Sequence, residues 1–142
     1  MKNSFVRKGL TLLIAIAMLV AFASCGEQET QTIESFMVAN PEVAADIDAK
    51  LGELPYKGMT VSIEYKDDNC TLTYKFDETY DKNKVKQRAK AFDDNANLID
   101  KQSIDLLDTI IKGTDFKNPS MTVRFLNGDD TEIWSKEYKT SK

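Results

Sequence analysis

Apolar residues recur at helical spacing after residue 32, and this pattern predicts the first helical part of the chain. The apolar positions 33, 36, 37, 43, 44, 47, 51 and 54 follow helical spacing. Asn40 and Pro41 are the residue types that favour a helix start, with Asn as the N-cap and Pro in the first turn. The pattern therefore predicts either two short helices or one helix kinked at Pro41, and the Gly- and Pro-containing segment 52–58 ends it.

A first β-hairpin is predicted by strict alternation of apolar and polar residues. Residues 59–65 place Met, Val, Ile and Tyr at every second position, and residues 70–76 place Cys, Leu, Tyr and Phe in the same way. Because successive strand residues point to opposite faces, each strand has one apolar and one polar face. The polar residues 66–69 form the turn of an antiparallel hairpin with one buried face.

A second hairpin is predicted around Asn127-Gly128, because Asn-Gly is the strongest tight-turn signal in the chain. It resembles the first hairpin, since Met-Thr-Val at 59–61 recurs 62 residues later at 121–123. Two origins of this similarity stay open. One is duplication of a unit made of a helix and a hairpin, and the other is the likeness of any two amphipathic hairpins with acidic tips.

A long helix is predicted between the two hairpins. From Tyr80 to Lys112 the chain has neither Gly nor Pro. From Val85 a mainly apolar set of residues, with Ser103 as its polar member, repeats at alternating spacings of four and three. We expect one amphipathic helix over 85–112, with Gly113 as its C-cap. It would span about 42 Å, against about 27 Å for an eight-residue strand, so its ends would overhang the sheet.

Together these elements predict an α+β fold in the order αββ-αββ. The four strands form one antiparallel sheet, and two helices pack on one of its faces. Alternation in the last strand predicts that Trp134 and Tyr138 face the core and that Ile133 lies on the open face. The chain is divided into a leader at 1–24, a short tether at 25–32 and a single domain at 33–142.

The first 25 residues have the anatomy of a signal peptide. Lys2, Arg7 and Lys8 precede an uncharged run at 10–23, which is shorter than the about 20 apolar residues of a spanning helix. The ending Phe-Ala-Ser-Cys-Gly resembles the lipobox of bacterial lipoproteins, in which Cys25 receives the lipid and becomes the first residue. This implies an extracytoplasmic protein anchored by acyl chains to the cell membrane or to an outer membrane. The alternative is an ordinary secretory signal with an incidental Cys.

Composition excludes several classes of function. The chain has 19 Lys+Arg and 23 Asp+Glu, and such an acidic surface disfavours nucleic acid as a partner. It has no His, which removes the usual base of serine and cysteine hydrolases and a common zinc ligand. Neither a nucleophile motif nor a calcium-loop motif is present. We therefore expect no catalytic residues, no metal and no cofactor, and we expect Cys70 to be a buried apolar residue.

Two charge patterns have alternative interpretations. Acid pairs at 67–68, 77–78, 93–94 and 129–130 are expected to be turn or solvated residues, and the alternatives are a carboxylate pair for catalysis or a surface calcium site. Residues 82–90 are rich in Lys and Arg at a helix start, which the helix dipole disfavours. They are solvated charge, a partner surface or a contact with anionic headgroups.

As a whole, residues 33–139 resemble a family of small bacterial lipoproteins known only as a domain of unknown function, with the order helix, hairpin, helix, hairpin. The motifs that carry the resemblance are Asn-Pro-Glu-Val at 40–43, Met-Thr-Val-Ser-Ile at 59–63 and Arg-Phe-Leu-Asn-Gly-Asp at 124–129. The resemblance implies a secreted, lipid-anchored domain, and it transfers no catalytic residue.

These observations predict a non-enzymatic binding or accessory module that contacts the membrane through its lipid and an envelope protein or small ligand through its sheet. The alternatives are a carboxylate-dependent envelope enzyme, and an inhibitor or immunity-type protein that uses the same face. The oligomeric state stays open. The expected contact surface is the open face of the sheet, formed by Thr60, Ser62, Glu64, Thr71, Thr73, Lys75, Thr122 and Arg124.

Overall fold

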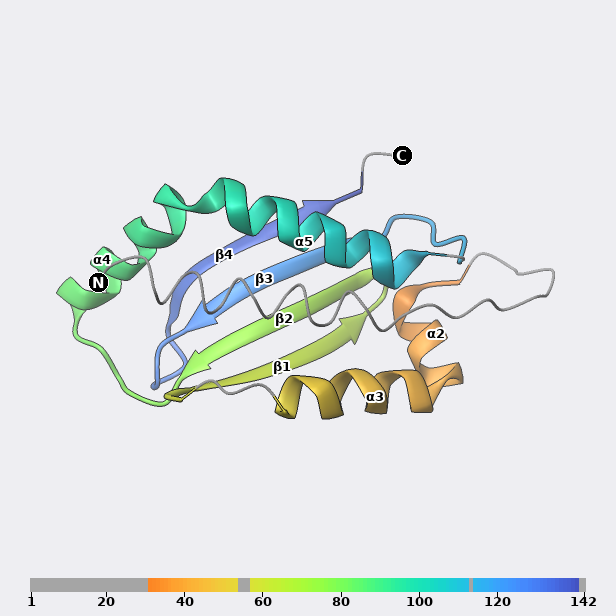
Figure 1. Ribbon diagram of the computed structural model, residues 1–142, viewed down its shortest axis with the longest axis horizontal. Coiled ribbons are helices and arrows are strands. Elements are labelled where there is room, and N and C mark those ends of the chain that lie inside the picture. The colour runs from red at the N-terminus through yellow and green to blue at the C-terminus, as the bar shows by residue number, and fades with distance from the viewer. Residues whose placement is uncertain (1–30, 54–56, 113, 141–142) are drawn as a thin grey trace.

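The computed structural model describes residues 31–53, 57–112 and 114–140 (Figure 1). The leader at 1–24, Cys25, most of the tether and Gly113 lie outside these residues. The elements in chain order are α2 (Ile33–Ala39), α3 (Pro41–Gly52), β1 (Met59–Lys66), β2 (Asn69–Phe76), α4 (Lys82–Asp94), α5 (Ala96–Ile111), β3 (Ser120–Leu126) and β4 (Glu132–Lys139).

The four strands form one mixed sheet in the order β1-β2-β3-β4. Both predicted hairpins are present as antiparallel pairs, but β2 and β3 pair in parallel, so the expectation of a wholly antiparallel sheet is wrong. The cause is the connection between them. Because α4 and α5 carry the chain back along the sheet before β3 begins, β3 starts beside the first residue of β2 and runs in the same direction (Figure 1).

Within the described residues two helices precede the first hairpin, which settles the alternative left open at Pro41. Pro41 opens α3, and Asn40 ends α2 with a non-helical φ of −127° and ψ of 66°. Both the backbone N–H and the side-chain Nδ2 of Asn40 donate to the carbonyl of Phe36, at 2.9 and 2.8 Å. The side chain thus completes the last turn of α2 while Pro41 starts a new helix.

Two helices also replace the single long helix predicted over 85–112, so the fold has four helices and not two in the described residues. The break lies at Asn95, whose φ is −114° and ψ is 15°. Its Nδ2 donates to the carbonyl of Ala91 at 2.7 Å, and its N–H donates to the carbonyl of Phe92 at 3.1 Å. An Asn side chain that competes for backbone carbonyls ends a helix without Gly or Pro.

The two hairpins have the same register but not the same placement in the sheet. Met59 pairs with Phe76, and Met121 pairs with Tyr138, which are equivalent positions at the offset of 62 residues. However, β1 and β3 run in opposite directions, because β1 is antiparallel to β2 and β2 is parallel to β3. No rotation carries β1 and β2 onto β3 and β4 while keeping both the strand order and the helix-covered face. The two halves are therefore not a superposable repeat.

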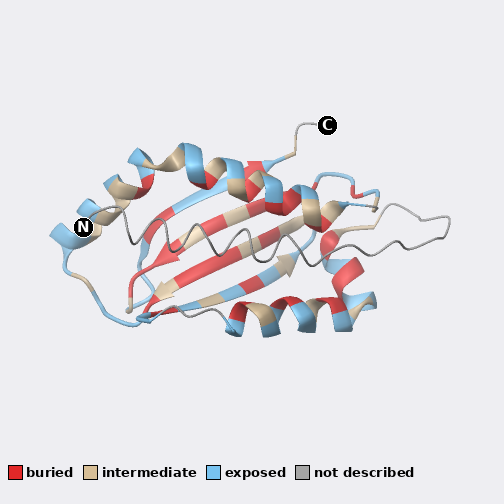
Figure 2. Ribbon diagram, in the orientation of Figure 1, coloured by how far each residue is buried: buried red, intermediate tan, exposed pale blue. Residues whose placement is uncertain are grey.

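One apolar core lies between the helices and the sheet (Figure 2). Trp134 and Tyr138 belong to it, as predicted. Ile133 also belongs to it and is only 7% exposed, so its expected place on the open face is wrong. The register shifts at this point: Phe125 pairs with Trp134 and Leu126 with Glu132, which leaves Ile133 as the extra residue of a bulge.

The Asn127-Gly128 corner holds the connection between β2 and α4. Asn127 is buried, and its Oδ1 accepts from the N–H of Tyr80 at 2.7 Å while its Nδ2 donates to the carbonyl of Tyr80 at 3.0 Å. A Cβ at Gly128 would lie 2.8 Å from the carbonyl carbon of Glu78 and 2.9 Å from the nitrogen of Thr79. This glycine is therefore required by a close approach between two segments of backbone.

Candidate functional site

The candidate site is the face of the sheet opposite the described helices, which we call the open face. The apolar residues of the strands point to the helix side, and the alternate residues point away from it. All eight residues expected on the open face belong to this second set. Their exposure differs: Thr60, Ser62 and Glu64 on β1 are exposed, Thr71, Lys75, Thr122 and Arg124 are half-buried, and Thr73 is buried.

Strand pairing aligns these residues in rows across the sheet. One row runs from Ser62 through Thr73 and Arg124 to Ser135. The adjacent row joins residues 64, 71, 122 and 137, with a glutamate at each edge and two threonines between them. The middle of the open face is thus rich in hydroxyl groups, and Arg124 is the charged residue at its centre.

Arg124 is held in place by a neighbouring strand. Its Nε donates to the Oγ1 of Thr73 at 2.8 Å, across the parallel pair β2–β3. Thr73 is only 6% exposed, so this hydrogen bond is largely shielded from water. Lys75, the other cation of the central strands, forms an ion pair with Asp130 at 2.6 Å.

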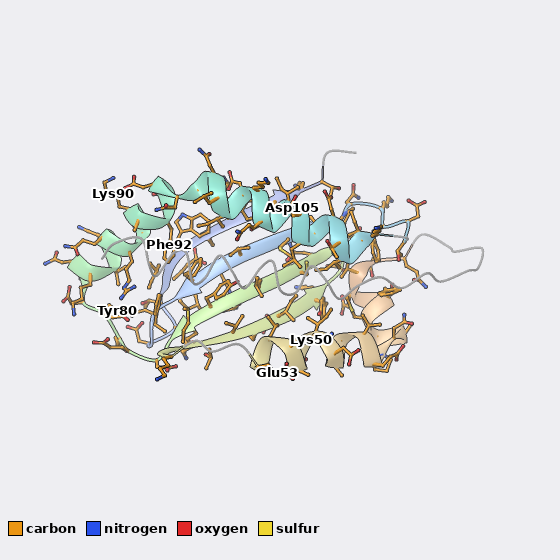
Figure 3. The ribbon with its side chains drawn as sticks, in the orientation of Figure 1. Lys50, Glu53, Tyr80, Lys90, Phe92 and Asp105 are labelled. Carbon is orange, nitrogen blue, oxygen red and sulfur yellow. The ribbon has the colours of Figure 1, made fainter. Side chains whose placement is uncertain are left out.

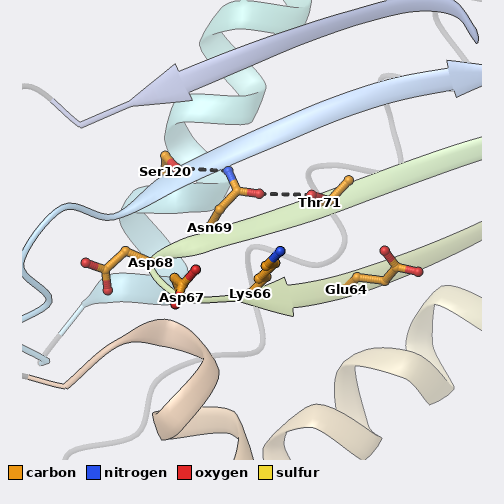
Figure 4. A pocket seen from close by; sticks show the side chains of 7 residues that line it. All are labelled: Glu64, Lys66, Asp67, Asp68, Asn69, Thr71 and Ser120. Carbon is orange, nitrogen blue, oxygen red and sulfur yellow. Dashed lines mark hydrogen bonds between the residues drawn. The ribbon is translucent and has the colours of Figure 1, made fainter.

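A second polar network crosses the same two strands near the β1–β2 turn (Figure 4). The Nδ2 of Asn69 donates to the Oγ of Ser120 at 2.9 Å and to the Oγ1 of Thr122 at 3.1 Å, while its Oδ1 accepts from the hydroxyl of Thr71 at 2.9 Å. A shallow hollow of about 340 Å³ opens here. It is lined by Glu64, Lys66, Asp67, Asp68, Asn69, Thr71 and Ser120.

Two acids of this hollow, Asp67 and Asp68, form hydrogen bonds that stabilise the fold. Asp67 has a positive φ of 51°, its carbonyl accepts from the N–H of Glu34 at 2.9 Å, and its N–H donates to the Oε2 of Glu34 at 2.7 Å. The Oδ2 of Asp68 accepts from the N–H of Asn118 at 3.0 Å, and its carbonyl accepts from the N–H of Ser120 at 2.8 Å. The 67–68 pair therefore fixes the turn to α2 and to the start of β3.

Other paired acids also bind groups of the protein. The Oδ1 of Asp129 accepts from the N–H and the hydroxyl of Thr131, and these two hydrogen bonds lower the pKa of the Asp129 carboxyl. The Oδ1 of Asp93 accepts from the indole N–H of Trp134 at 2.8 Å. Over the described ranges, no group of three or more Cys, Asp or Glu side chains is placed to hold a metal ion.

The basic residues of 82–90 lie on α4, which projects beyond the sheet edge. Phe92 points from α4 toward the sheet, whereas Lys90 lies on the outer side (Figure 3) and pairs with Asp94 at 2.8 Å. The guanidinium of Arg88 lies 4.0 Å from the ring centre of Tyr80 and 4.7 Å from that of Phe76. Part of this basic charge is thus used in contacts within the domain.

Comparison with known proteins gives one family. The family described as a domain of unknown function, DUF4854, matches residues 33–138. The chain belongs to this family. No curated protein and no solved structure matches the chain significantly. DUF4854 membership confirms the resemblance to a domain of unknown function. The order helix, hairpin, helix, hairpin is corrected, because two helices precede each hairpin in the part of the chain that the structure describes.

No helix in the described part of this DUF4854 protein is long and apolar enough to cross a bilayer. Sequence reasoning placed the open face by alternation alone. It missed the Arg124–Thr73 hydrogen bond, because this contact depends on the parallel pairing of β2 with β3. The signal that points to it is an arginine within a strand, two residues after Thr122 on the same face.

Proposed function

We propose that this protein is a non-enzymatic, lipid-anchored binding or accessory protein of the bacterial cell envelope, and that its open face contacts a partner. The observation that carries the proposal is the polar centre of that face. Ser62 is exposed, Arg124 is half-buried, and the helices that fill the core lie on the other side of the sheet.

The lipid anchor is supported by the lipobox-like ending at Cys25. The place where the chain enters the domain decides which end of the domain an anchor would hold near the membrane. Gln31 forms a β-bridge with Phe116, and Asp67 contacts Glu34 beside it, so the chain enters at the end that holds the β1–β2 turn. Six residues from Cys25 to Gln31 reach at most about 21 Å. An acyl chain on Cys25 would keep this end near the bilayer surface and direct the opposite end, with the β3–β4 turn, away from it.

An inhibitor or immunity-type protein would bind through the same open face. It would differ from a general accessory protein only in the identity of its partner. The open face favours a protein partner over a small molecule, because the hollow at its end is shallow and open to solvent. Flat, polar surfaces of this kind suit protein contacts better than the concave, apolar pockets that bind small ligands.

The proposal is tested by capture of partners from envelope extracts with matched variants of the full chain in neutral detergent. Ser62→Glu adds charge to the open face, and Asn97→Glu adds the same charge to the outer side of α5, where Asn97 is exposed. We expect a protein that the wild type and Asn97→Glu retain and that Ser62→Glu loses. Equal retention by all three forms would contradict the assignment of the open face.

A further inference from the structure

We infer that Arg124 is the anchor of the open face and binds a carboxylate of an acidic side chain on a partner protein. This inference rests on the proposed function, since it names the chemistry by which the same face would recognise its partner. It goes further, because it assigns the recognition to one guanidinium group and one class of ligand.

The geometry leaves the end of the Arg124 guanidinium available. Its Nε donates to the hydroxyl oxygen of Thr73. Among the described residues this is the side-chain hydrogen bond that Arg124 forms. A guanidinium held at Nε presents its two terminal NH2 groups as a fork, and a carboxylate matches such a fork with two parallel hydrogen bonds. Because Thr73 is nearly fully buried, the fork is held in one orientation before any ligand arrives.

Arg124 differs in this respect from four lysines of the described part. Lys75 pairs with Asp130, Lys90 with Asp94 and Lys136 with Asp100, at 2.6, 2.8 and 2.8 Å. Lys139 lies 3.7 Å from Glu137. Arg124 has no carboxylate within ion-pair distance among the residues described. A carboxylate from a partner would therefore supply the counter-ion that Arg124 lacks among the described residues.

The nearby acids do not neutralise Arg124, but they select the charge of its ligand. Glu137 pairs with Lys139, and Glu132 accepts a hydrogen bond from Ser135, the residue directly opposite Arg124, at 2.7 Å. Glu64 lies at the other edge of the adjacent row. Glu64 and Glu132, for which no ion pair is present among the described residues, repel a phosphate, with a charge near −2, more strongly than a singly charged carboxylate. We therefore assign a carboxylate and not a phosphate.

Binding of a carboxylate to Arg124 can be followed directly by NMR, because the chain has few arginine side chains to distinguish. They are Arg7, Arg88 and Arg124. Their side-chain Nε–H signals are resolved by NMR on the 15N-labelled full chain in neutral detergent and assigned with Arg124→Lys and Arg88→Lys. The probes are acetyl-Glu-amide, its uncharged match acetyl-Gln-amide, and inorganic phosphate. We expect a saturable shift of the Arg124 signal with the Glu probe, little change with the Gln probe, and weaker binding of phosphate.

Several results would overturn the assignment. They are an Arg124 signal that does not move with the Glu probe, one that moves equally with the Gln probe, tighter binding of phosphate, or an equal shift of Arg88. Arg88 is the internal control, because its guanidinium is stacked on Tyr80 and Phe76.

Partner capture separates this inference from the proposed function. Arg124→Gln should weaken capture by about 10-fold or more, as expected for loss of a charged hydrogen bond. Arg124→Lys should capture less partner than the wild type and more than Arg124→Gln. Circular dichroism confirms that each variant is folded. If Ser62→Glu abolishes capture and Arg124→Gln leaves it unchanged, the open face is the binding surface but Arg124 is not its anchor. If neither variant alters capture, the proposed function fails as well.

Discussion

Arg124 and Thr73 lie directly opposite each other on the two central strands, and the Nε of Arg124 donates to the Oγ1 of Thr73 at 2.8 Å. The two residues are 51 positions apart in the chain. Their contact exists because α4 and α5 return the chain beside the start of β2 (Figure 1). The parallel pair β2–β3 therefore both joins the two hairpins and builds the centre of the open face.

The first prediction concerns the link between Asn127 and Tyr80. Asn127→Ala removes two hydrogen bonds to the backbone of Tyr80, at 2.7 and 3.0 Å, from a buried site. We expect the free energy of unfolding to fall by about 2–4 kcal/mol, because both backbone groups lose their partner. Urea unfolding measures this. Asn118→Ala, at an exposed residue, is the control and should change stability by less than about 0.5 kcal/mol.

The second prediction uses two glycines that differ in their surroundings. Gly128→Ala brings a Cβ within 2.8 Å of the Glu78 backbone, whereas a Cβ at Gly52, the last residue of α3, meets nothing within 4 Å. We expect Gly128→Ala to lower stability by about 1–3 kcal/mol. Gly52→Ala should be neutral or stabilising by up to about 1 kcal/mol. Thermal unfolding of both variants measures the two changes in stability. Equal changes in the two variants would contradict the close backbone approach at Gly128.

The third prediction is loss of stability at alkaline pH. Burial raises the pKa of the Cys70 thiol from 9.0 to about 12, and burial also raises the pKa values of Tyr65 and Tyr138. A group with a raised pKa in the folded state stays neutral there while it ionises in the unfolded chain, so stability is full below pH 9 and falls from pH 9 toward pH 12. Urea unfolding at pH 7.5 and pH 10.5 should show this loss.

Cys70→Ala is the matched variant for that experiment. It removes one of the three ionising groups, so the difference in unfolding free energy between pH 7.5 and pH 10.5 should become smaller than in the wild type. The variant also creates a small cavity at a fully buried site and lowers stability at both pH values. An unchanged pH dependence would show that the Cys70 thiol is not shielded from ionisation in the folded state.

The fourth prediction concerns the anchor. When the full chain is produced in a bacterium grown with labelled palmitate, the wild type should carry the label and sediment with membranes. Cys25→Ser should lose both properties, because the hydroxyl of Ser does not form the thioether of the lipidated Cys. Cys70→Ser is the control and should keep the label. Retention of the label by Cys25→Ser would contradict lipidation at this residue.

The parts of the fold that depend on local pattern were predictable. Alternation alone gave both hairpins, and Pro41 marked a helix start. The break at Asn95 was missed because a side chain replaces the backbone donors there, and periodicity does not detect such a replacement. Ile133 was misplaced because a bulge removes the alternation on which the prediction relied.

On the open face, too, some features were predictable from local pattern and others depend on strand pairing. Its members followed from alternation, but the burial of Thr73 and the unpaired charge of Arg124 depend on which strands become neighbours. That choice is made by the path of α4 and α5 between the hairpins, which no short window of sequence contains.

Site-specific photo-cross-linking in the producing cell tests the central claim most directly. A photoreactive residue is placed at Ser62 or Ser135, on the two edge strands of the open face, or at Asn97 or Lys101, exposed on α5. We predict that both open-face positions give an adduct of the same added mass and that neither helix position does. Adducts from the α5 positions without any from the open-face positions would contradict the open face as the binding surface.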